Sequence, residues 1–138
     1  MANELDEVNV MTIAHPKPQM VSKDTPLFKA ADKMLRLKIH SVIVVDDESG
    51  GKLLGVLSSL DIVKTAFLSA EKAKNIPVGS LIEGQKPYFV YQEVSVRDVL
   101  NLMVDKGIRS LPILNDQDKV AGIITMSDVL RLVKEKLV

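Results

Sequence analysis

Gly55–Ile62 reads GVLSSLDI and Gly122–Val129 reads GIITMSDV, so one short pattern occurs twice in the chain. Each copy has a glycine, two aliphatic residues, a hydroxyl residue, two further residues, an aspartate and an aliphatic residue. The aspartates, Asp61 and Asp128, are 67 residues apart. Self-similarity at a fixed spacing is the sequence signature of a repeated structural unit. The pattern therefore predicts that the 138-residue chain folds as two related copies.

The repetition continues upstream of this pattern. TPLFKAADKMLRLKIHSVIVVD (Thr25–Asp46) aligns with VSVRDVLNLMVDKGIRSLPILN (Val94–Asn115) at a spacing of 69 residues. The spacing between equivalent residues is 69 before the hairpin and 67 after it. The first copy therefore has two extra residues, within DDESGG at positions 46–51. A polar, glycine-rich hairpin tip tolerates such an insertion, so the length difference supports the repeat.

A single copy of about sixty residues would leave its apolar strands poorly covered. Two related copies can cover each other, so we expect one module with two interdependent halves. The first repeat is placed at 8–70 and the second at 71–138, after an N-terminal extension at 1–7.

Each copy is predicted to follow the order strand, helix, strand, strand, helix. Apolar residues at helical spacing predict a helix capped by Thr25 and another capped by Ser95, and Gly107 is expected to end the second. The fold class is therefore mixed α/β (α+β), with two pseudo-symmetric β-α-β-β-α repeats packed as one module. The other expected elements are strands at 19–21 and 88–90, buried strands at 41–46 and 111–114, return strands at 52–58 and 120–125, and helices beginning near Ser59 and Ser127.

Composition disfavours several classes of function. Eighteen Lys and Arg residues balance eighteen Asp and Glu residues, so no net charge attracts nucleic acid or an anionic membrane. The absence of cysteine removes disulfides, thiolate nucleophiles and zinc-thiolate sites. The acidic start MANELDEVNV lacks the apolar region of a signal peptide, and no apolar run approaches the ~18 residues of a membrane span. We therefore expect a cytoplasmic globular protein with no membrane partner.

The repeated hydroxyl–x–x–aspartate pattern has two interpretations, and the sequence leaves both open. As capping boxes, Ser58–Asp61 and Thr125–Asp128 would satisfy free backbone N–H groups at the start of a helix. As binding sites, they would place N–H groups and an aspartate where a strand leads into a helix, and an aspartate can accept hydrogen bonds from a vicinal diol such as ribose. Recurrence in both copies shifts the balance toward binding, but the spacing alone does not identify a nucleotide.

No catalytic or metal-binding constellation accompanies this pattern. The chain lacks a phosphate-binding P-loop, a G-x-G-x-x-G motif and a recognisable Ser/His/Asp arrangement, so we expect neither an enzyme nor a catalytic cofactor. Two histidines and scattered carboxylates give no metal-ligand spacing. DDESGG is interpreted as a solvated hairpin and His15 as a solvated loop residue.

The ordered set of motifs resembles the CBS domain, named after cystathionine β-synthase, over about Val8 to Leu132. The second copy carries the resemblance through Ser95–Val96, Met103, Gly107–Ile113, Gly122–Thr125 and Asp128–Val129. The first copy carries it through Thr25–Leu27, Met34, Ile39–Asp46, Gly55–Ser58 and Asp61. The chain is therefore identified as a standalone tandem CBS pair, often called a Bateman module.

The resemblance implies an adenosine-containing ligand, bound in clefts between the two halves. AMP, ADP or ATP is favoured over S-adenosylmethionine or NAD. Asp61 and Asp128 would hold ribose hydroxyls, and Ser58 and Thr125 would contact ribose or phosphate. The remaining implied site residues are His40 and Arg109 for phosphate, the backbones of Val42, Val44, Leu111, Pro112 and Ile113 for adenine, and Thr12 and Ile82 from the neighbouring segments 11–13 and 81–82.

Two positions of the first copy depart from the family pattern. The family strand usually carries a proline, as Pro112 does, whereas the first copy has Ile43. His40 stands where the second copy has Arg109. An unperturbed histidine is mostly neutral at pH 7, whereas arginine keeps its charge and its planar fork. We therefore expect the phosphate subsite at Arg109 to be the stronger, and the sequence does not show which aspartate shares it.

Three functions remain open. The first is a regulatory sensor, in which an adenosyl ligand favours one arrangement of the halves and the module acts in trans on an unknown protein partner. A homodimer is expected from the resemblance. The second is a protein-interaction module with vestigial clefts, which acts through dimerisation. The third is nucleic-acid binding, which the zero net charge makes least favoured.

Overall fold

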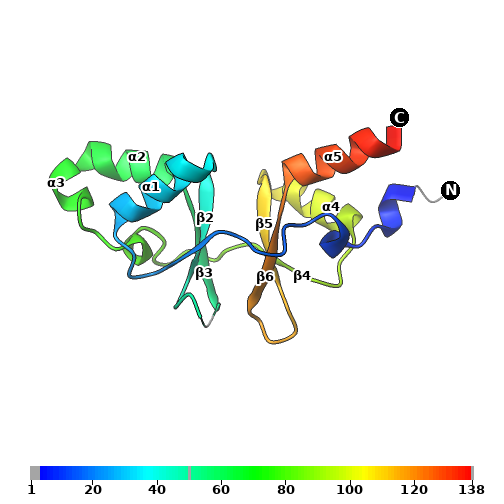
Figure 1. The fold of residues 1–138 in the computed structure, drawn as a ribbon, viewed down its shortest axis with the longest axis horizontal. Helices are drawn as coiled ribbons and strands as arrows, with labels where there is room; N and C mark the ends of the chain where they lie inside the picture. The colour runs from blue at the N-terminus through cyan, green and yellow to red at the C-terminus, as the bar shows by residue number, and fades with distance from the viewer. Residues whose placement is uncertain (1–3, 50, 138) are drawn as a thin grey trace. The chain divides into compact units, whose positions relative to one another are not determined.

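The computed structural model describes residues 4–49 and 51–137 (Figure 1). By its internal contacts the chain divides into two compact units. The first unit is Gln19–Pro87, and the second unit combines the described parts of Met1–Pro18 and Tyr88–Val138. Parts of three expected segments lie outside the described residues: positions 1–3 of the extension, Gly50 of the DDESGG hairpin, and Val138 at the end of the second repeat.

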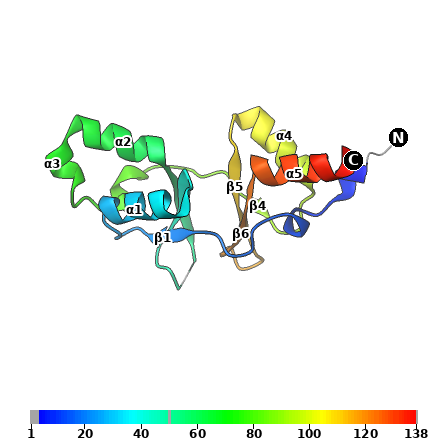
Figure 2. The same cartoon turned by 45° about the horizontal axis from the view of Figure 1, so that its top comes forward.

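The first unit is built around a three-stranded sheet. Its elements are β1 (Met20–Ser22), α1 (Leu27–Leu37), β2 (Ser41–Val45), β3 (Leu53–Ser58), α2 (Ser59–Leu68), α3 (Ala70–Ala73) and the 3-10 helix η3 (Val78–Leu81). The strand order is β1-β2-β3, with β1 parallel and β3 antiparallel to β2. Helices α1 and α2 lie on one face of this sheet (Figures 1 and 2).

The second unit repeats this architecture. Its elements are the 3-10 helices η1 (Glu4–Glu7) and η2 (Val10–Thr12), then β4 (Val90–Tyr91), α4 (Val96–Lys106), β5 (Ser110–Leu114), β6 (Val120–Thr125) and α5 (Met126–Leu137). The strand order is β4-β5-β6, with the same parallel and antiparallel pairing. The predicted mixed α+β class and the β-α-β-β-α order are therefore confirmed in both copies.

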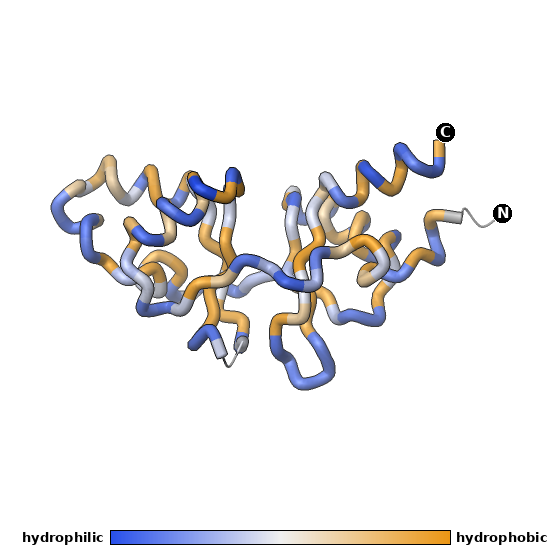
Figure 3. The backbone as a smooth tube through the Cα atoms, viewed as in Figure 1, coloured by the Kyte–Doolittle hydropathy of each residue, from blue (hydrophilic) through white to orange (hydrophobic). Residues whose placement is uncertain are grey.

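The central strand of each sheet forms the core of its unit. All residues of β2 after Ser41 and all residues of β5 after Ser110 are buried. The helices add Ala30 of α1 and Val99 of α4, which are fully buried at equivalent positions. Strands buried on both faces read as continuous apolar runs, which explains the sequences SVIVV and SLPIL. The turn between β5 and β6 is hydrophilic in Figure 3, as expected for a solvated tip.

The starts of α1 and α4 differ from each other. Ser95 caps α4 as predicted, since its Oγ accepts from the N–H of Asp98 at 3.2 Å. The predicted Thr25 cap is wrong, because Pro26 is the N-cap of α1 and makes no side-chain capping bond. The N–H of Leu27 instead donates to the carbonyl of Ile76 at 2.9 Å, so a distant backbone group replaces the side-chain cap.

The ends of these two helices take the same backbone conformation. Gly107 ends α4 with φ +65°, as predicted, and Lys38 occupies the equivalent position of α1 with φ +56°. Glycine adopts this left-handed region without steric cost, whereas a residue with a Cβ does not. The first copy therefore carries mild strain where the second carries none.

Each compact unit includes a short segment that the predicted repeat boundaries assign to the other repeat. In the second unit the N–H of Val10 donates to Val94 at 3.0 Å, and the N–H of Val96 donates to Val8 at 2.8 Å. In the first unit Val78 donates to Thr25 at 2.8 Å, alongside the bond from α1 to Ile76. The compact units therefore group the chain differently from the repeats placed at 8–70 and 71–138, whose boundaries stay a sequence-level prediction.

Across the described residues, no helix combines the length and apolar character that crossing a membrane requires.

Replacing Ile113 with alanine should lower the free energy of unfolding by about 2–5 kcal/mol, because it opens a cavity in the middle of β5. Ile113 is fully buried, whereas Leu137 at the end of α5 is 80% exposed. Leu137→Ala is therefore the matched control and should change stability by less than about 0.5 kcal/mol. Urea denaturation measures both. Equal losses in the two variants would contradict this assignment of the core.

Replacing Gly122 with alanine should loosen the pairing between β6 and His15. A Cβ at this position would lie 2.8 Å from the carbonyl oxygen of His15, which cannot move freely because His15 and Ile123 exchange two backbone hydrogen bonds of 2.9 and 3.0 Å. We expect a loss of about 1–3 kcal/mol, with faster amide hydrogen exchange at His15 and Ile123. Gly107→Ala, strained but remote from this contact, should not accelerate these two amides selectively.

Candidate functional site

The junction between β3 and α2 is held by a complete capping box. Asp61 Oδ2 accepts hydrogen bonds from the N–H of Ser58 at 3.0 Å and from its hydroxyl at 2.8 Å. Ser58 Oγ in turn accepts from the N–H of Asp61 at 3.1 Å. The hydroxyl–x–x–aspartate pattern therefore has the structural role that one of its two interpretations assigned to it. This role uses only one carboxylate oxygen of Asp61.

The junction between β6 and α5 has the same geometry. Asp128 Oδ2 accepts from the N–H and hydroxyl of Thr125 at 2.8 and 2.9 Å, and the N–H of Asp128 lies 3.3 Å from Thr125 Oγ1. The repeated sequence pattern thus builds the same strand-to-helix connection in both units. The second oxygen, Oδ1, is again free of the box.

The two predicted phosphate-facing residues lie directly beside these junctions. The carbonyl of His40 accepts from the N–H of Ser59 at 2.8 Å, and the carbonyl of Arg109 accepts from the N–H of Met126 at 2.8 Å. Both basic residues are exposed. The structure therefore groups His40 with the Asp61 box in the first unit and Arg109 with the Asp128 box in the second.

The two aspartates differ in what contacts their remaining oxygen. Among the described residues, Asp61 Oδ1 has no hydrogen-bond partner, and Asp61 is partly exposed. Asp128 is 1% exposed, and its Oδ1 lies 3.0 Å from His15 Nε2 and 3.2 Å from Arg131 Nη1. His15 is solvated, as interpreted from the sequence, since its side chain is 58% exposed, but its imidazole also contacts the buried carboxylate and its backbone pairs with β6.

A cavity of about 300 Å³ adjoins the first box. It is lined by Asp61, Lys64 and Thr65 of α2 and by Ile76, Ser80 and Leu81 of the following segment. Ligand pockets start at about this volume. Asp61 thus borders a space that a small polar ligand can enter.

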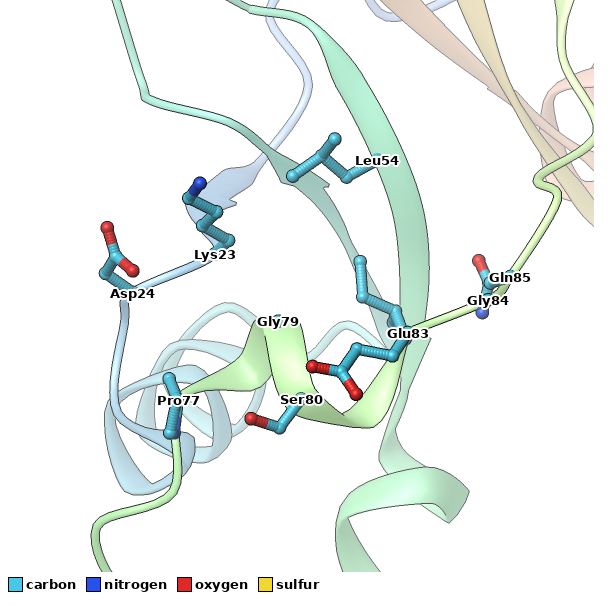
Figure 4. A pocket seen from close by; sticks show the side chains of 10 residues that line it. Lys23, Asp24, Leu54, Pro77, Gly79, Ser80, Glu83, Gly84 and Gln85 are labelled. Atoms are coloured by element: carbon cyan, nitrogen blue, oxygen red, sulfur yellow. The ribbon is translucent and has the colours of Figure 1, made fainter.

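A second hollow of the first unit, about 410 Å³, lies around η3 and contains neither predicted aspartate. Figure 4 shows Lys23, Leu54 and Glu83 around it. Of the predicted site residues, only Ile82 lines this hollow. Ser80 lines both this hollow and the cavity at Asp61, and the other lining residues of the two spaces differ.

Gln85, which the sequence analysis did not single out, binds the edge of β3. Its side-chain amide accepts from the N–H of Val56 at 2.7 Å and donates to the carbonyl of Val56 at 3.3 Å. In the second unit the backbone of His15 makes the corresponding pair of bonds to Ile123. A side-chain amide therefore replaces a main-chain amide in the first unit, a substitution that the repeat alignment could not reveal.

The residues predicted to face adenine lie in different surroundings. Val42, Val44, Leu111, Pro112 and Ile113 are buried in the central strands, which are paired on both sides. Thr12 is exposed on η2 in the unit of Asp128, and Ile82 is buried in the unit of Asp61. The contact of these residues with a base remains a prediction.

Two basic residues of the site were missed, Lys64 and Arg131. They occupy equivalent positions, each three residues after its aspartate. The 67-residue spacing could therefore have drawn attention to them. The role of His15 had no comparable signal, because its contact with Asp128 joins residues far apart in the sequence.

Comparison with known proteins identifies relatives along most of the chain. The family model described as CBS domain matches residues 10–67 and 78–135. An uncharacterized protein of Methanopyrus kandleri is 34% identical over 102 residues, which cover 74% of this chain and 50% of that protein. An uncharacterized 17.7 kDa protein of Acidianus ambivalens is 28% identical over 122 residues, which cover 88% of this chain and 71% of that protein. The chain thus spans only half of the first relative.

Two solved structures share the fold. The CBS domain pair of protein MJ0100, solved with 5′-methylthioadenosine and S-adenosyl-L-methionine, has a TM-score of 0.78 and 26% identity, covering 94% of this chain and 98% of that one. CBSX2, solved in complex with AMP, has a TM-score of 0.81 and 23% identity, covering 95% and 99%. The matched family ranges include both capping boxes and most of the chain, so the chain belongs to the CBS domain family and carries two CBS domains in tandem.

Proposed function

We propose that the chain is a regulatory module that senses an adenosyl ligand, an adenine nucleotide above all, and signals to a partner protein in trans. The ligand's ribose would bind at the Ser58–Asp61 and Thr125–Asp128 boxes. His40 and Arg109 would face its phosphate. In this proposal the chain catalyses no reaction itself.

The open oxygen of Asp61 carries this proposal. The capping box holds Oδ2 and thereby fixes the carboxylate, while Oδ1 has no hydrogen-bond partner among the described residues. A fixed acceptor beside a cavity of about 300 Å³ suits a vicinal diol, which donates two hydrogen bonds to one carboxylate. A capping role alone would not require this space.

The charges around the boxes support a phosphorylated ligand. An exposed basic residue adjoins each helix start through its own carbonyl, and Lys64 lines the cavity at Asp61. Arginine and helix N-termini both favour phosphate. The ligands of the MJ0100 domain pair, 5′-methylthioadenosine and S-adenosyl-L-methionine, share the adenosyl group and give independent support for a ligand of this class.

The cavity also offers a route for a signal. Ile76, Ser80 and Leu81 line it; the segment that holds these residues belongs to the first compact unit, although the predicted repeat boundaries place it in the second repeat. The same segment fixes the start of α1 through Ile76 and Val78. A ligand that contacts this segment would favour one of its conformations, which is the differential interaction that regulation requires.

Thermal unfolding should reveal the ligand. A screen of AMP, ADP, ATP, S-adenosylmethionine, 5′-methylthioadenosine and NAD should include at least one compound that stabilises the protein, by about 2.7 kcal/mol at one hundred times its dissociation constant. The double variant D61N/D128N should lose this stabilisation. Asparagine keeps the shape of the side chain but lacks the charged carboxylate that accepts hydrogen bonds from the diol.

Asp98→Asn is the matched control for this screen. Asp98 follows Ser95 at the same capping-box spacing, at the start of α4, but it belongs to neither repeated box. The control should lose some stability and keep its response to the ligand. If none of the six compounds stabilises the wild-type protein at millimolar concentration, the boxes serve only as helix caps.

We also propose that the chain forms a homodimer through exposed apolar helix positions. Leu35 of α1 and Val104 of α4 are 80% and 73% exposed at equivalent positions of the repeat. Val63 of α2 and Leu130 of α5 form a second equivalent pair, 50% and 66% exposed. Exposed apolar residues that recur on both units favour an interface that uses both of them.

Analytical ultracentrifugation should find a dimer for the wild-type chain and a monomer for V63E/L130E, because a charge in an apolar interface is costly. Lys72→Glu, at an exposed position of α3, is the control for the change of charge and should remain dimeric. A monomeric wild-type chain at micromolar concentration would contradict the dimer.

A further inference from the structure

We infer that the two boxes are unequal binding sites, and that His15 and Arg131 decide this by occupying the acceptor oxygen of Asp128. At Asp61 a ligand diol can donate to Oδ1 directly. At Asp128 the side chains of His15 and Arg131 must first leave Oδ1. This inference rests on the proposed function and specifies which box binds the ribose first. It concerns the ribose contacts alone, and the expectation that Arg109 gives the stronger phosphate subsite stays a separate prediction.

The Asp128 carboxylate is fully used by the protein. Thr125 donates two hydrogen bonds to Oδ2, and His15 and Arg131 approach Oδ1 at 3.0 and 3.2 Å. The aspartate is 1% exposed, so its charge needs such partners. A diol that donates to Oδ1 would therefore compete with contacts that already stabilise a buried charge.

The Asp61 carboxylate lacks both competitors. Lys64 occupies the position equivalent to Arg131, and no ion pair joins it to Asp61 among the described residues. The position corresponding to His15 along the β3 edge is taken by Gln85, whose amide binds the backbone of Val56 rather than the carboxylate. A ligand at Asp61 thus gains hydrogen bonds without displacing any protein donor from Oδ1.

Both competing side chains are able to leave Asp128. The side chains of His15 and Arg131 are 58% and 59% exposed, so each can turn toward water while its backbone stays in place. The backbone of His15 remains fixed by its two bonds to Ile123. Side-chain rotation, rather than unfolding of the segment, is therefore what opens the second site.

Isothermal titration of the full chain with 5′-methylthioadenosine tests this inequality. This probe has a ribose diol and no phosphate, so removing cations does not weaken it through lost phosphate attraction. D61N should weaken binding by about tenfold or more, the scale of a charged hydrogen bond. In the D61N background, adding H15A and R131A should restore binding by about tenfold through Asp128, and a further D128N change should abolish it.

Arg97→Ala is the matched control, because it removes another arginine–aspartate contact, to Asp6 at 2.6 Å, in the same unit. In the D61N background it should restore nothing. If H15A/R131A lowers the melting temperature too far for titration, H15A alone in the D61N background provides the test and should give a smaller gain.

The outcomes separate the inference from the proposed function. If the wild-type chain binds neither 5′-methylthioadenosine nor any other compound of the thermal screen, the proposed function fails and the inference fails with it. If the wild-type chain binds, but D128N removes the binding and D61N does not, the proposed function stands and the inference is overturned. A triple variant, D61N/H15A/R131A, that binds no better than D61N overturns it as well.

Discussion

One carboxylate at the end of a strand organises each half of this protein. The aspartate of each box binds the N–H and hydroxyl of the residue that ends the strand, and so fixes the angle at which the helix leaves the sheet. Only one oxygen is needed for this purpose. The other oxygen takes no part in the junction: at Asp61 it has no hydrogen-bond partner among the described residues, whereas at Asp128 it contacts His15 and Arg131.

The local architecture could be predicted because it depends on neighbours in sequence. The buried strands and the helices followed from apolar runs and helical spacing, and Ser95 and Gly107 mark the ends of α4 through short-range chemistry. The Thr25 cap failed because Ile76, a residue far along the chain, supplies the acceptor at the start of α1. Local rules do not contain such contacts.

The same distinction separates the predicted and missed parts of the site. The boxes were visible because each lies within four residues, and His40 and Arg109 followed from a family resemblance that is tied to local motifs. His15 reaches Asp128 across most of the chain, and Gln85 reaches Val56 across 29 residues. Both belong to segments that pack beside the other repeat, and the spacing of the repeats carries no information on that packing.

Duplication explains how one box can differ from the other without loss of the fold. Both boxes keep the bonds to Oδ2 on which the strand-to-helix junction depends, so the two halves need the same contacts to fold. The contacts to Oδ1 lie outside that requirement and are free to diverge. Burial at Asp128 makes protein donors favourable there, whereas the cavity beside Asp61 leaves its oxygen to water or to a ligand. The two units therefore share one fold but differ in the chemistry of their boxes. The bonds to Oδ2 are the same in both boxes, whereas the contacts to Oδ1 differ.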